Sequence, residues 1–258
     1  ADGDGGLRII DVSNPAFPSE AGSYDTGYAH GVTVAGDYAY VAAHGLRIID
    51  ISNPAFPSEV GSCDTTGGAD DVAVGGNHAY IASKWGGLHV IDASDPAVPS
   101  EVASLGTPGG TQGVAVSGSY AYTVDGYYDL HDGLHIIDVS VPATPDEVGF
   151  CATPAEARAV EIVGEHAYVA AATSGLRIIN VTDPTAPTQV GFCDTPGTAY
   201  DVAVAGSYAY VADDVGGLRI IDVSNPADPI EVGFCDTPAS AHRVTVAGDH
   251  AYVGAYAS

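Results

Sequence analysis

Residues 218–226 read Leu-Arg-Ile-Ile-Asp-Val-Ser-Asn-Pro, and residues 7–15 read the same. The phrase returns four more times with small changes, at intervals of 39 to 46 residues, and its copies begin at Leu7, Leu46, Leu88, Leu134, Leu176 and Leu218. Its first half is rich in leucine and isoleucine, which is typical of a strand, and the closing proline cannot donate a hydrogen bond to a sheet. We therefore read the phrase as one strand of a repeating unit.

Three other phrases recur in step with the first. They are exemplified by Val-Thr-Val-Ala-Gly at 32–36, Tyr-Ala-Tyr-Val-Ala-Ala at 38–43 and Glu-Val-Gly-Phe-Cys-Asp-Thr at 231–237. Each is short, β-branched or aromatic, and bounded by turn residues, which predicts a strand. Four antiparallel strands in each unit are typical of a propeller blade. The sequence therefore predicts an all-β fold, a six-bladed β-propeller of four-stranded antiparallel blades.

The phrase Leu-Arg-Ile-Ile-Asp-Val-Ser-Asn-Pro resembles the repeat of the LVIVD-repeat β-propeller family, and the resemblance extends over essentially the whole chain. Only the copy at 176–184 lacks the aspartate, with Asn180 in its place. The resemblance implies a protein that is secreted or attached to the cell surface. It brings no catalytic motif, so no catalytic residue is assigned.

The two ends of the chain are predicted to share one blade, within a single domain over residues 1–258. Residues 7–26 would supply its outer two strands and residues 243–255 its inner two, and their pairing would close the ring and remove free edges. The same pairing between chains would build a filament of copies, which we keep as an alternative. The chain starts without methionine, so we expect either that a leader was removed or that this is a piece of a longer protein.

The composition restricts the partners. The chain has 33 acidic and 7 basic residues, a formal net charge of −26. Nucleic acids and anionic membranes need a basic face, so we expect no nucleic-acid partner, and no apolar run is long enough for membrane insertion. Because an acidic, lysine-poor surface suits salty or extracellular surroundings, we expect an extracellular or cell-surface location.

Arginines of the leading strand are predicted to form structural ion pairs. Four copies carry arginine, and seventeen residues later each has an aspartate, which gives the pairs Arg8–Asp25, Arg47–Asp64, Arg177–Asp194 and Arg219–Asp236. The other two copies have His89 and His135, and both lack the aspartate. Cross-strand ion pairs explain why the two residue types occur and vanish together.

One position varies among repeats that are otherwise monotonous. Just before the innermost strand stand polar residues of five kinds, namely His30, Asp70, Gln112, Arg158, Tyr200 and His242. In propellers these loops surround one mouth of the central channel, and Trp85 and Tyr127 are expected beside it. Aromatic rings with carboxylates suit a glycan or a peptide. We predict a ligand site at this mouth.

Two classes of function remain open. The first is a non-enzymatic binding or scaffold module for a protein, peptide or glycan, which could be part of a larger assembly. The second is a metal-assisted hydrolase or lyase that uses His30, Asp70 and His242 as metal ligands or acid–base groups. We expect no cofactor, with calcium at the acidic mouth as the alternative.

Overall fold

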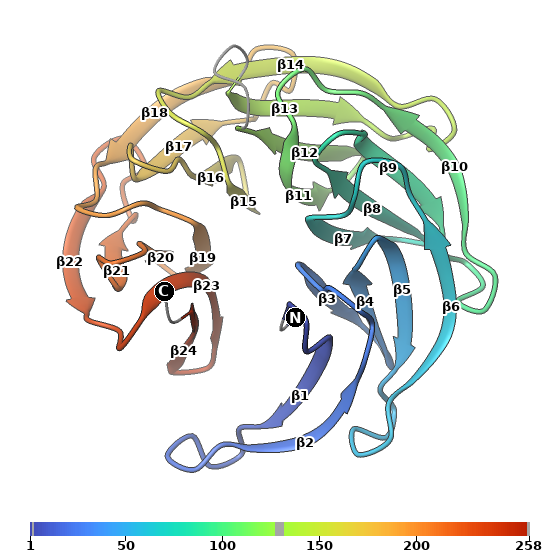
Figure 1. Cartoon of the computed structure of the whole chain (residues 1–258). Coiled ribbons are helices and arrows are strands. Elements are labelled where there is room, and N and C mark those ends of the chain that lie inside the picture. Colours follow the sequence, from blue (N-terminus) through green and yellow to red (C-terminus); the bar gives the residue numbers. More distant parts are fainter. Residues whose placement is uncertain (2, 127–131, 257–258) are drawn as a thin grey trace. The chain divides into compact units, whose positions relative to one another are not determined.

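The computed structural model describes residues 1, 3–126 and 132–256, which form strands β1 to β24 and no helix (Figure 1). None of these residues therefore belongs to a helix able to cross a membrane. The described chain divides into two compact units, residues 1–119 with 139–145 and residues 120–138 with 146–258. The single domain over 1–258 therefore stays a prediction.

The first unit contains two complete blades and a two-stranded sheet. One blade pairs, in chain order, β3 (Val32–Ala35), β4 (Tyr38–Ala42), β5 (Gly45–Asp50) and β6 (Ser58–Asp64). The next pairs β7 (Asp71–Gly75), β8 (His78–Ser83), β9 (Gly87–Asp92) and β10 (Ser100–Leu105). The two-stranded sheet is β1 (Leu7–Asp11) with β2 (Ser19–Tyr24). Strand β11 (Thr111–Ser117) lies against β7 and β8.

The second unit repeats the same order. It begins with β12 (Tyr120–Asp125), β13 (Gly133–Asp138) and β14 (Asp146–Ala152). Its first complete blade is β15 (Ala159–Val163), β16 (His166–Ala170), β17 (Leu176–Asn180) and β18 (Thr188–Cys193). The second is β19 (Asp201–Ala205), β20 (Tyr208–Ala212), β21 (Leu218–Asp222) and β22 (Ile230–Cys235). A two-stranded sheet, β23 (Ser240–Ala247) with β24 (His250–Tyr256), follows.

This strand order confirms the predicted all-β class and the four-stranded antiparallel blade. Strands 7–11 and 19–24 pair with each other in the first unit, and strands 240–247 and 250–256 pair with each other in the second. The closure of the ring by residues 7–26 and 243–255 would join the two units, so it stays a prediction.

The apolar positions of the repeat form the core between neighbouring blades. Leu46 and Ile48 of β5, both fully buried, pack in one cluster with Val72 of β7 and Ile81 of β8. Each such aliphatic side chain contributes about 1.5–3 kcal/mol when it is removed from water. At the end of β5 the carboxylate of Asp50 accepts a hydrogen bond from the backbone N–H of Ser52 at 2.8 Å, which forms a turn and ends the strand.

A glycine in the outer strand admits the loop of the next blade. A Cβ atom on Gly61 would lie 2.2 Å from the carbonyl oxygen of Pro96, a distance at which no side chain fits. The same contact recurs between equivalent residues, namely Gly22 with Pro54, Gly149 with Pro184 and Gly191 with Pro226. We call it the glycine–proline latch. It explains why these four outer strands keep a glycine although glycine weakens strands, whereas β10 has Ala103 at the equivalent position.

The predicted ion pairs are present in two of four repeats. Arg47 and Arg177 contact Asp64 and Asp194, each at 2.9 Å. Arg219 instead contacts Glu231 at 3.4 Å and the buried Asp213 at 3.6 Å, and its expected partner Asp236 is exposed.

Arg8 contacts Glu20 at 2.6 Å, and its expected partner Asp25 accepts a hydrogen bond from the backbone of Gly27. The two histidines likewise use the glutamate twelve residues on, with His89 at 3.1 Å from Glu101 and His135 at 3.0 Å from Glu147. The leading and outer strands of every repeat share one register shift, which brings the residue twelve positions on diagonally beside the basic residue, so that a glutamate there is a second carboxylate within reach. The spacing of seventeen residues therefore identified only one of two available carboxylates.

Candidate functional site

The variable position has the same backbone anchor in both units. The N–H of His30 donates to the carbonyl of Ala42 at 3.0 Å, and that of Asp70 donates to Ala82 at 2.9 Å. Arg158 and Tyr200 make the equivalent bonds, to Ala170 and Ala212. The inner hairpin of each blade is thereby extended by one bond. The side chain at the variable position can differ from repeat to repeat, because this hydrogen bond uses only the backbone of that residue.

In the second unit three of the predicted residues form a continuous stack. The guanidinium carbon of Arg158, just before β15, lies 4.4 Å from the ring centre of Tyr200, just before β19. The imidazole of His242 in β23 stacks on the same tyrosine, with ring centres 4.0 Å apart and ring planes 10° apart. Tyr256 meets His242 edge-on at 5.2 Å. Arg158 and His242 come from the strands on either side of β19, so Tyr200 lies between them.

An acidic residue lies beside Arg158 at one end of the stack, and another lies beside His242 at the other end. Arg158 Nη2 donates to Glu156 Oε2 at 2.5 Å, while Arg158 Nε is buried without a hydrogen-bond partner among the described residues. His242 Nε2 lies 3.6 Å from Asp214 Oδ1. Burial lowers the pKa of His242, and the nearby Asp214 only partly offsets that effect. Burial therefore favours the neutral imidazole, which suits stacking against a phenol ring.

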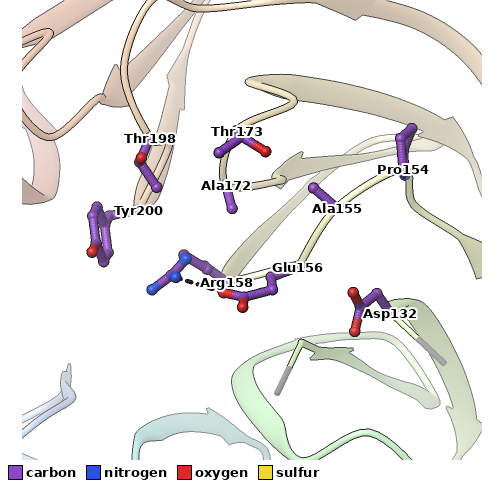
Figure 2. Close-up of a pocket in the computed structure, with 9 residues that line it drawn as sticks. All are labelled: Asp132, Pro154, Ala155, Glu156, Arg158, Ala172, Thr173, Thr198 and Tyr200. Atoms are coloured by element: carbon purple, nitrogen blue, oxygen red, sulfur yellow. Dashed lines mark hydrogen bonds and ion pairs between the residues drawn. The ribbon is translucent and has the colours of Figure 1, made fainter. Parts of the chain in front are cut away.

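A pocket of about 450 Å³ lies beside the arginine end of this stack. It is lined by backbone and side chains of loops in the second unit, including Asp132, Glu156, Arg158, Thr173, Thr198 and Tyr200. Figure 2 shows Arg158 between Tyr200 and Glu156, with the ion pair drawn as a dashed line. The lining carries two carboxylates against one guanidinium, and the guanidinium is already neutralised by Glu156. We call it the Arg158 pocket.

The first unit holds the other predicted residues. The ring of His30 lies 4.8 Å from that of Tyr28, and Nε2 of Gln112 is buried without a hydrogen-bond partner among the described residues. Asp70 precedes β7, and Trp85 is 68% exposed, with the ammonium of Lys84 6.0 Å from its ring centre. Tyr127 lies outside the described residues. Since the two sets belong to different units, their meeting at one channel mouth stays a prediction.

Metal binding also stays a prediction. In residues 3–126 and 132–256, no three histidine, cysteine, aspartate or glutamate side chains gather as metal ligands would. Of the candidates, His30 and Asp70 lie in the first unit and His242 lies in the second. The hydrolase or lyase alternative and calcium at an acidic mouth therefore stay predictions.

Carboxylates that follow the variable position have a structural role that sequence reasoning missed. Asp71 Oδ2 accepts a hydrogen bond from Val114 N at 3.1 Å, and Asp201 Oδ2 accepts one from Val244 N at 2.9 Å. Glu161 Oε2 does the same for Val204 N at 2.6 Å. Each bond joins the innermost strands of two consecutive repeats. Part of the polar variety near the mouth therefore holds blades together and is not available to a ligand.

Sequence reasoning also missed Glu156, Asp132 and Thr198 as pocket residues. Glu156 and Thr198 stand two residues before Arg158 and Tyr200, at a position where the repeats again differ: Tyr28, Gly68, Gly110 and Ser240 occupy it elsewhere. Variation among the repeats at this second position was the feature of the sequence that could have identified Glu156 and Thr198. Asp132 belongs to the insertion of the longest repeat, between β12 and β13.

A comparison with known protein families matches every repeat of this chain except the last strands. The model of the LVIVD repeat matches residues 1–26, 27–65, 66–107, 108–153, 154–195 and 196–237. Among curated proteins no match was found.

Several solved structures resemble the chain. A chain in the crystal structure of the Mitotic Checkpoint Complex has a TM-score of 0.77 at 12% identity, over 97% of this chain and 82% of that one. The Cps50 (Swd1) β-propeller domain of Myceliophteria thermophila has a TM-score of 0.70 at 12% identity, over 88% and 78%. The computationally designed Ika8 protein has a TM-score of 0.73 at 11% identity, over 98% and 75%. At such identities the likeness shows the fold alone, and it confirms the propeller fold of six repeats.

Proposed function

This chain belongs to the LVIVD-repeat family, and from that premise we propose that it is a non-enzymatic binding module of the extracellular space or cell surface, with a peptide segment of a partner protein as its ligand. The observation that carries the proposal is the Arg158 pocket beside the Arg158–Tyr200–His242 stack. Binding sites of repeat proteins typically lie in loops, at pockets that are lined by polar residues. One of the similar solved structures is itself a protein complex, the Mitotic Checkpoint Complex.

The geometry favours a peptide over a glycan. Tyr200 is flanked by the guanidinium of Arg158 and the imidazole of His242, at 4.4 and 4.0 Å from its ring centre. A sugar would need one free face of the ring for stacking. The groups that the pocket offers are instead carboxylates, threonine hydroxyls and backbone, which suit hydrogen bonds and ion pairs with a peptide.

Charge indicates which peptide. Glu156 is 39% exposed, and Asp132 also lines the pocket, so a ligand meets carboxylate oxygens there. The net charge of −26 attracts cations over a distance and repels acidic chains, which raises the association rate for a basic partner. The ligand that we propose is therefore a segment with lysine or arginine, whose side chain lies between Asp132 and Glu156.

The test is an array of short peptides in which each basic member has a twin with lysine and arginine replaced by glutamine. The best binder is then titrated in a calorimeter against the wild type, Glu156→Gln and Asp132→Asn. We expect basic peptides to bind and their twins to fail. Each substitution should weaken binding about tenfold, equivalent to about 1.4 kcal/mol, and added salt should weaken it further.

Asp249→Asn is the matched control, because Asp249 is an exposed carboxylate in the turn between β23 and β24, away from the pocket residues in sequence. It changes the net charge by the same amount and should leave the affinity unchanged. An equal loss in Asp249→Asn would show that only the overall charge matters. Binding to a glycan array without any binding to basic peptides would refute the proposal.

A further inference from the structure

The leading strand carries a basic residue in all six repeats, but in two of them this residue is a histidine. The residue that follows the first leucine is an arginine four times, and it is His89 in β9 and His135 in β13. A guanidinium is always charged, whereas an imidazole gains or loses a proton near neutral pH. The two repeats with histidine therefore have a cation whose charge can depend on pH.

The ring of His89 faces a hydrogen-bond acceptor at each of its nitrogens. Nδ1 lies 3.1 Å from Oε1 of Glu101 in β10, and Nε2 lies 3.1 Å from the backbone carbonyl of Thr66. A carboxylate and a carbonyl only accept hydrogen bonds, and a neutral imidazole has one N–H to donate. Both contacts are hydrogen bonds only when the ring carries two protons. The geometry therefore favours an imidazolium at His89, although this residue is only 1% exposed.

The partners of His89 offset the cost of burying its charge. Glu101 supplies the opposite charge, and the Thr66 carbonyl supplies the second acceptor. His135 in the second unit lies between two acceptors as well, with Nδ1 3.0 Å from Glu147 Oε1 and Nε2 3.6 Å from Asp125 Oδ2. The arrangement thus recurs in both repeats that have histidine in place of arginine.

His89 lies where two loops of the first unit meet. Thr66 belongs to the loop between β6 and β7, and its carbonyl also accepts a hydrogen bond from Ser83 Oγ at 2.7 Å. A Cβ on Gly86, in the turn between β8 and β9, would lie 2.3 Å from His89 Nε2 and 2.6 Å from the same carbonyl. That turn also carries Trp85. Because the ring, the carbonyl and the turn are packed this closely, a shift of Thr66 must move the turn as well.

We propose that His89 is a pH-sensitive switch that holds these two loops together while both of its ring nitrogens are protonated. When the ring loses a proton, Nδ1 keeps its hydrogen, because the carboxylate of Glu101 binds it more strongly than a neutral carbonyl would. The lone pair of Nε2 then faces the lone pairs of the Thr66 carbonyl, and the two atoms repel each other. The turn that carries Trp85 therefore opens as the pH rises.

The other titratable groups near His89 are few. Within residues 3–126 and 132–256, Glu101 is the one titratable side chain that forms a hydrogen bond or ion pair with the ring. Beyond it lies Cys63 of β6, whose sulfur meets the backbone of Glu101, and burial raises the pKa of this thiol, so that it stays protonated at neutral pH. Lys84 stands beside Trp85, with its ammonium 6.0 Å from the centre of the indole ring. The test therefore needs a variant at His89 itself.

The fluorescence of Trp85 tests the inference on the full chain, because Trp85 is the only tryptophan of the sequence. Quenching by acrylamide, which is uncharged, measures how accessible the indole ring is. We expect the quenching constant of the wild type to rise about 1.5-fold from about pH 5 to about pH 9, a range that brackets the titration of imidazole. A quenching constant that does not change with pH would overturn the inference. Every residue involved lies in the first unit, so the outcome is independent of the Arg158 pocket.

Two variants separate His89 from the other groups. His89→Arg combined with Gly106→Asp restores the arginine and the aspartate of the other four repeats, and a Cβ on Gly106 meets no described atom within 4 Å. Quenching in this double variant should be independent of pH. His78→Gln removes a histidine at the far end of β8 and should respond as the wild type does. A response that persists in the double variant, or that disappears in His78→Gln, would assign the switch to another group and overturn the inference.

Nitrogen NMR of the imidazole rings detects the protons on the unaltered chain. The signals of His89 are assigned by their absence from the double variant. At the acidic end of the range both ring nitrogens should carry a proton, and at the alkaline end only Nδ1 should. A ring whose Nε2 keeps its proton at the alkaline end would also overturn the inference, because the hydrogen bond to Thr66 would then remain.

Discussion

Strands β18 and β22 carry the same four residues, Val-Gly-Phe-Cys, at 190–193 and 232–235, and yet their surroundings differ. Both pair with their leading strands through the same register shift, between Ile178 and Ile179 and between Ile220 and Ile221. Both also place a phenylalanine under an arginine, at 4.7 Å for Phe192 and 4.9 Å for Phe234. Local sequence has therefore produced the same local structure twice.

The difference comes from the neighbouring repeat. Gly191 is buried under the loop that carries Pro226, whereas among the described residues of the second unit a Cβ on Gly233 would meet only Ile220 of its own blade. A local substitution adds a second difference: Arg219 reaches the fully buried Asp213 of its own blade, whereas Ala171 stands at the equivalent position in the blade of Arg177, which pairs with an exposed aspartate. The comparison teaches that the same residue can contribute differently to the free energy of unfolding in each repeat, because its contribution depends on which residues cover it.

The largest expected effect is the contrast between Gly191→Ala and Gly233→Ala. The first substitution places a Cβ 2.0 Å from the carbonyl oxygen of Pro226, so the loop must move, and we expect a loss of about 2–4 kcal/mol in the free energy of unfolding. Within the second unit the nearest described atom to a Cβ on Gly233 is 3.9 Å away, so we expect the second substitution to change it by less than about 0.5 kcal/mol. Urea denaturation of both variants measures the contrast. Equal losses would show that the two glycines are equally covered in solution.

A smaller contrast is expected between Arg219→Met and Arg177→Met. Removing Arg219 leaves the buried Asp213 without its cation, so we expect a loss of about 1–2 kcal/mol at pH 7. Removing Arg177 breaks a pair whose aspartate is 67% exposed, and solvent screening keeps that loss below about 1 kcal/mol. Methionine keeps an apolar stem over the phenylalanine in both cases. Guanidinium denaturation would screen these pairs, so urea is the proper denaturant.

The pH dependence sharpens the Arg219 contrast. Burial raises the pKa of Asp213, while hydrogen bonds from Thr195 and Gly197 and the charge of Arg219 partly offset it. Without Arg219 the folded-state pKa rises further above the unfolded value, so the folded variant holds its proton more tightly. The deficit of Arg219→Met should therefore shrink as the pH falls from 7 towards 4, and that of Arg177→Met should change less. A deficit for Arg219→Met that is constant with pH would contradict the pairing with Asp213.

The smallest contrast concerns Cys193 and Cys235. Burial raises the pKa of the Cys193 thiol, with a hydrogen bond from the backbone of Glu231 as a smaller opposing effect. Cys193→Ala should cost about 0.5–1 kcal/mol of unfolding free energy, because a partly buried group is lost. Cys235→Ala should cost nearly nothing in the isolated chain, since its side chain is exposed. Thermal unfolding of both variants at low concentration provides the measurement, and a larger loss for Cys235 would show that it is covered.

The sequence predicted part of the candidate site. It identified Arg158, Tyr200 and His242, because a variable polar column in a monotonous repeat is visible without any structure. It did not assign Asp132 of the insertion at 125–133 to the site, nor did it foresee the structural role of Asp201, whose carboxylate reaches a backbone N–H forty-three residues on. It left a glycan and a peptide both open as ligands, and only the structure shows that Arg158 and His242 lie against the ring of Tyr200.

By itself, then, the sequence determined the number of repeats, the strands, their turns and the blade, because periodic apolar residues and fixed turn residues act over a few positions along the chain. Only the tertiary structure decided which carboxylate pairs with each basic residue, which glycine lies under a proline, and which side chains share a pocket. These outcomes depend on register shifts and on contacts between blades. Such contacts join residues far apart in sequence, and the spacing along the chain carries little information about them.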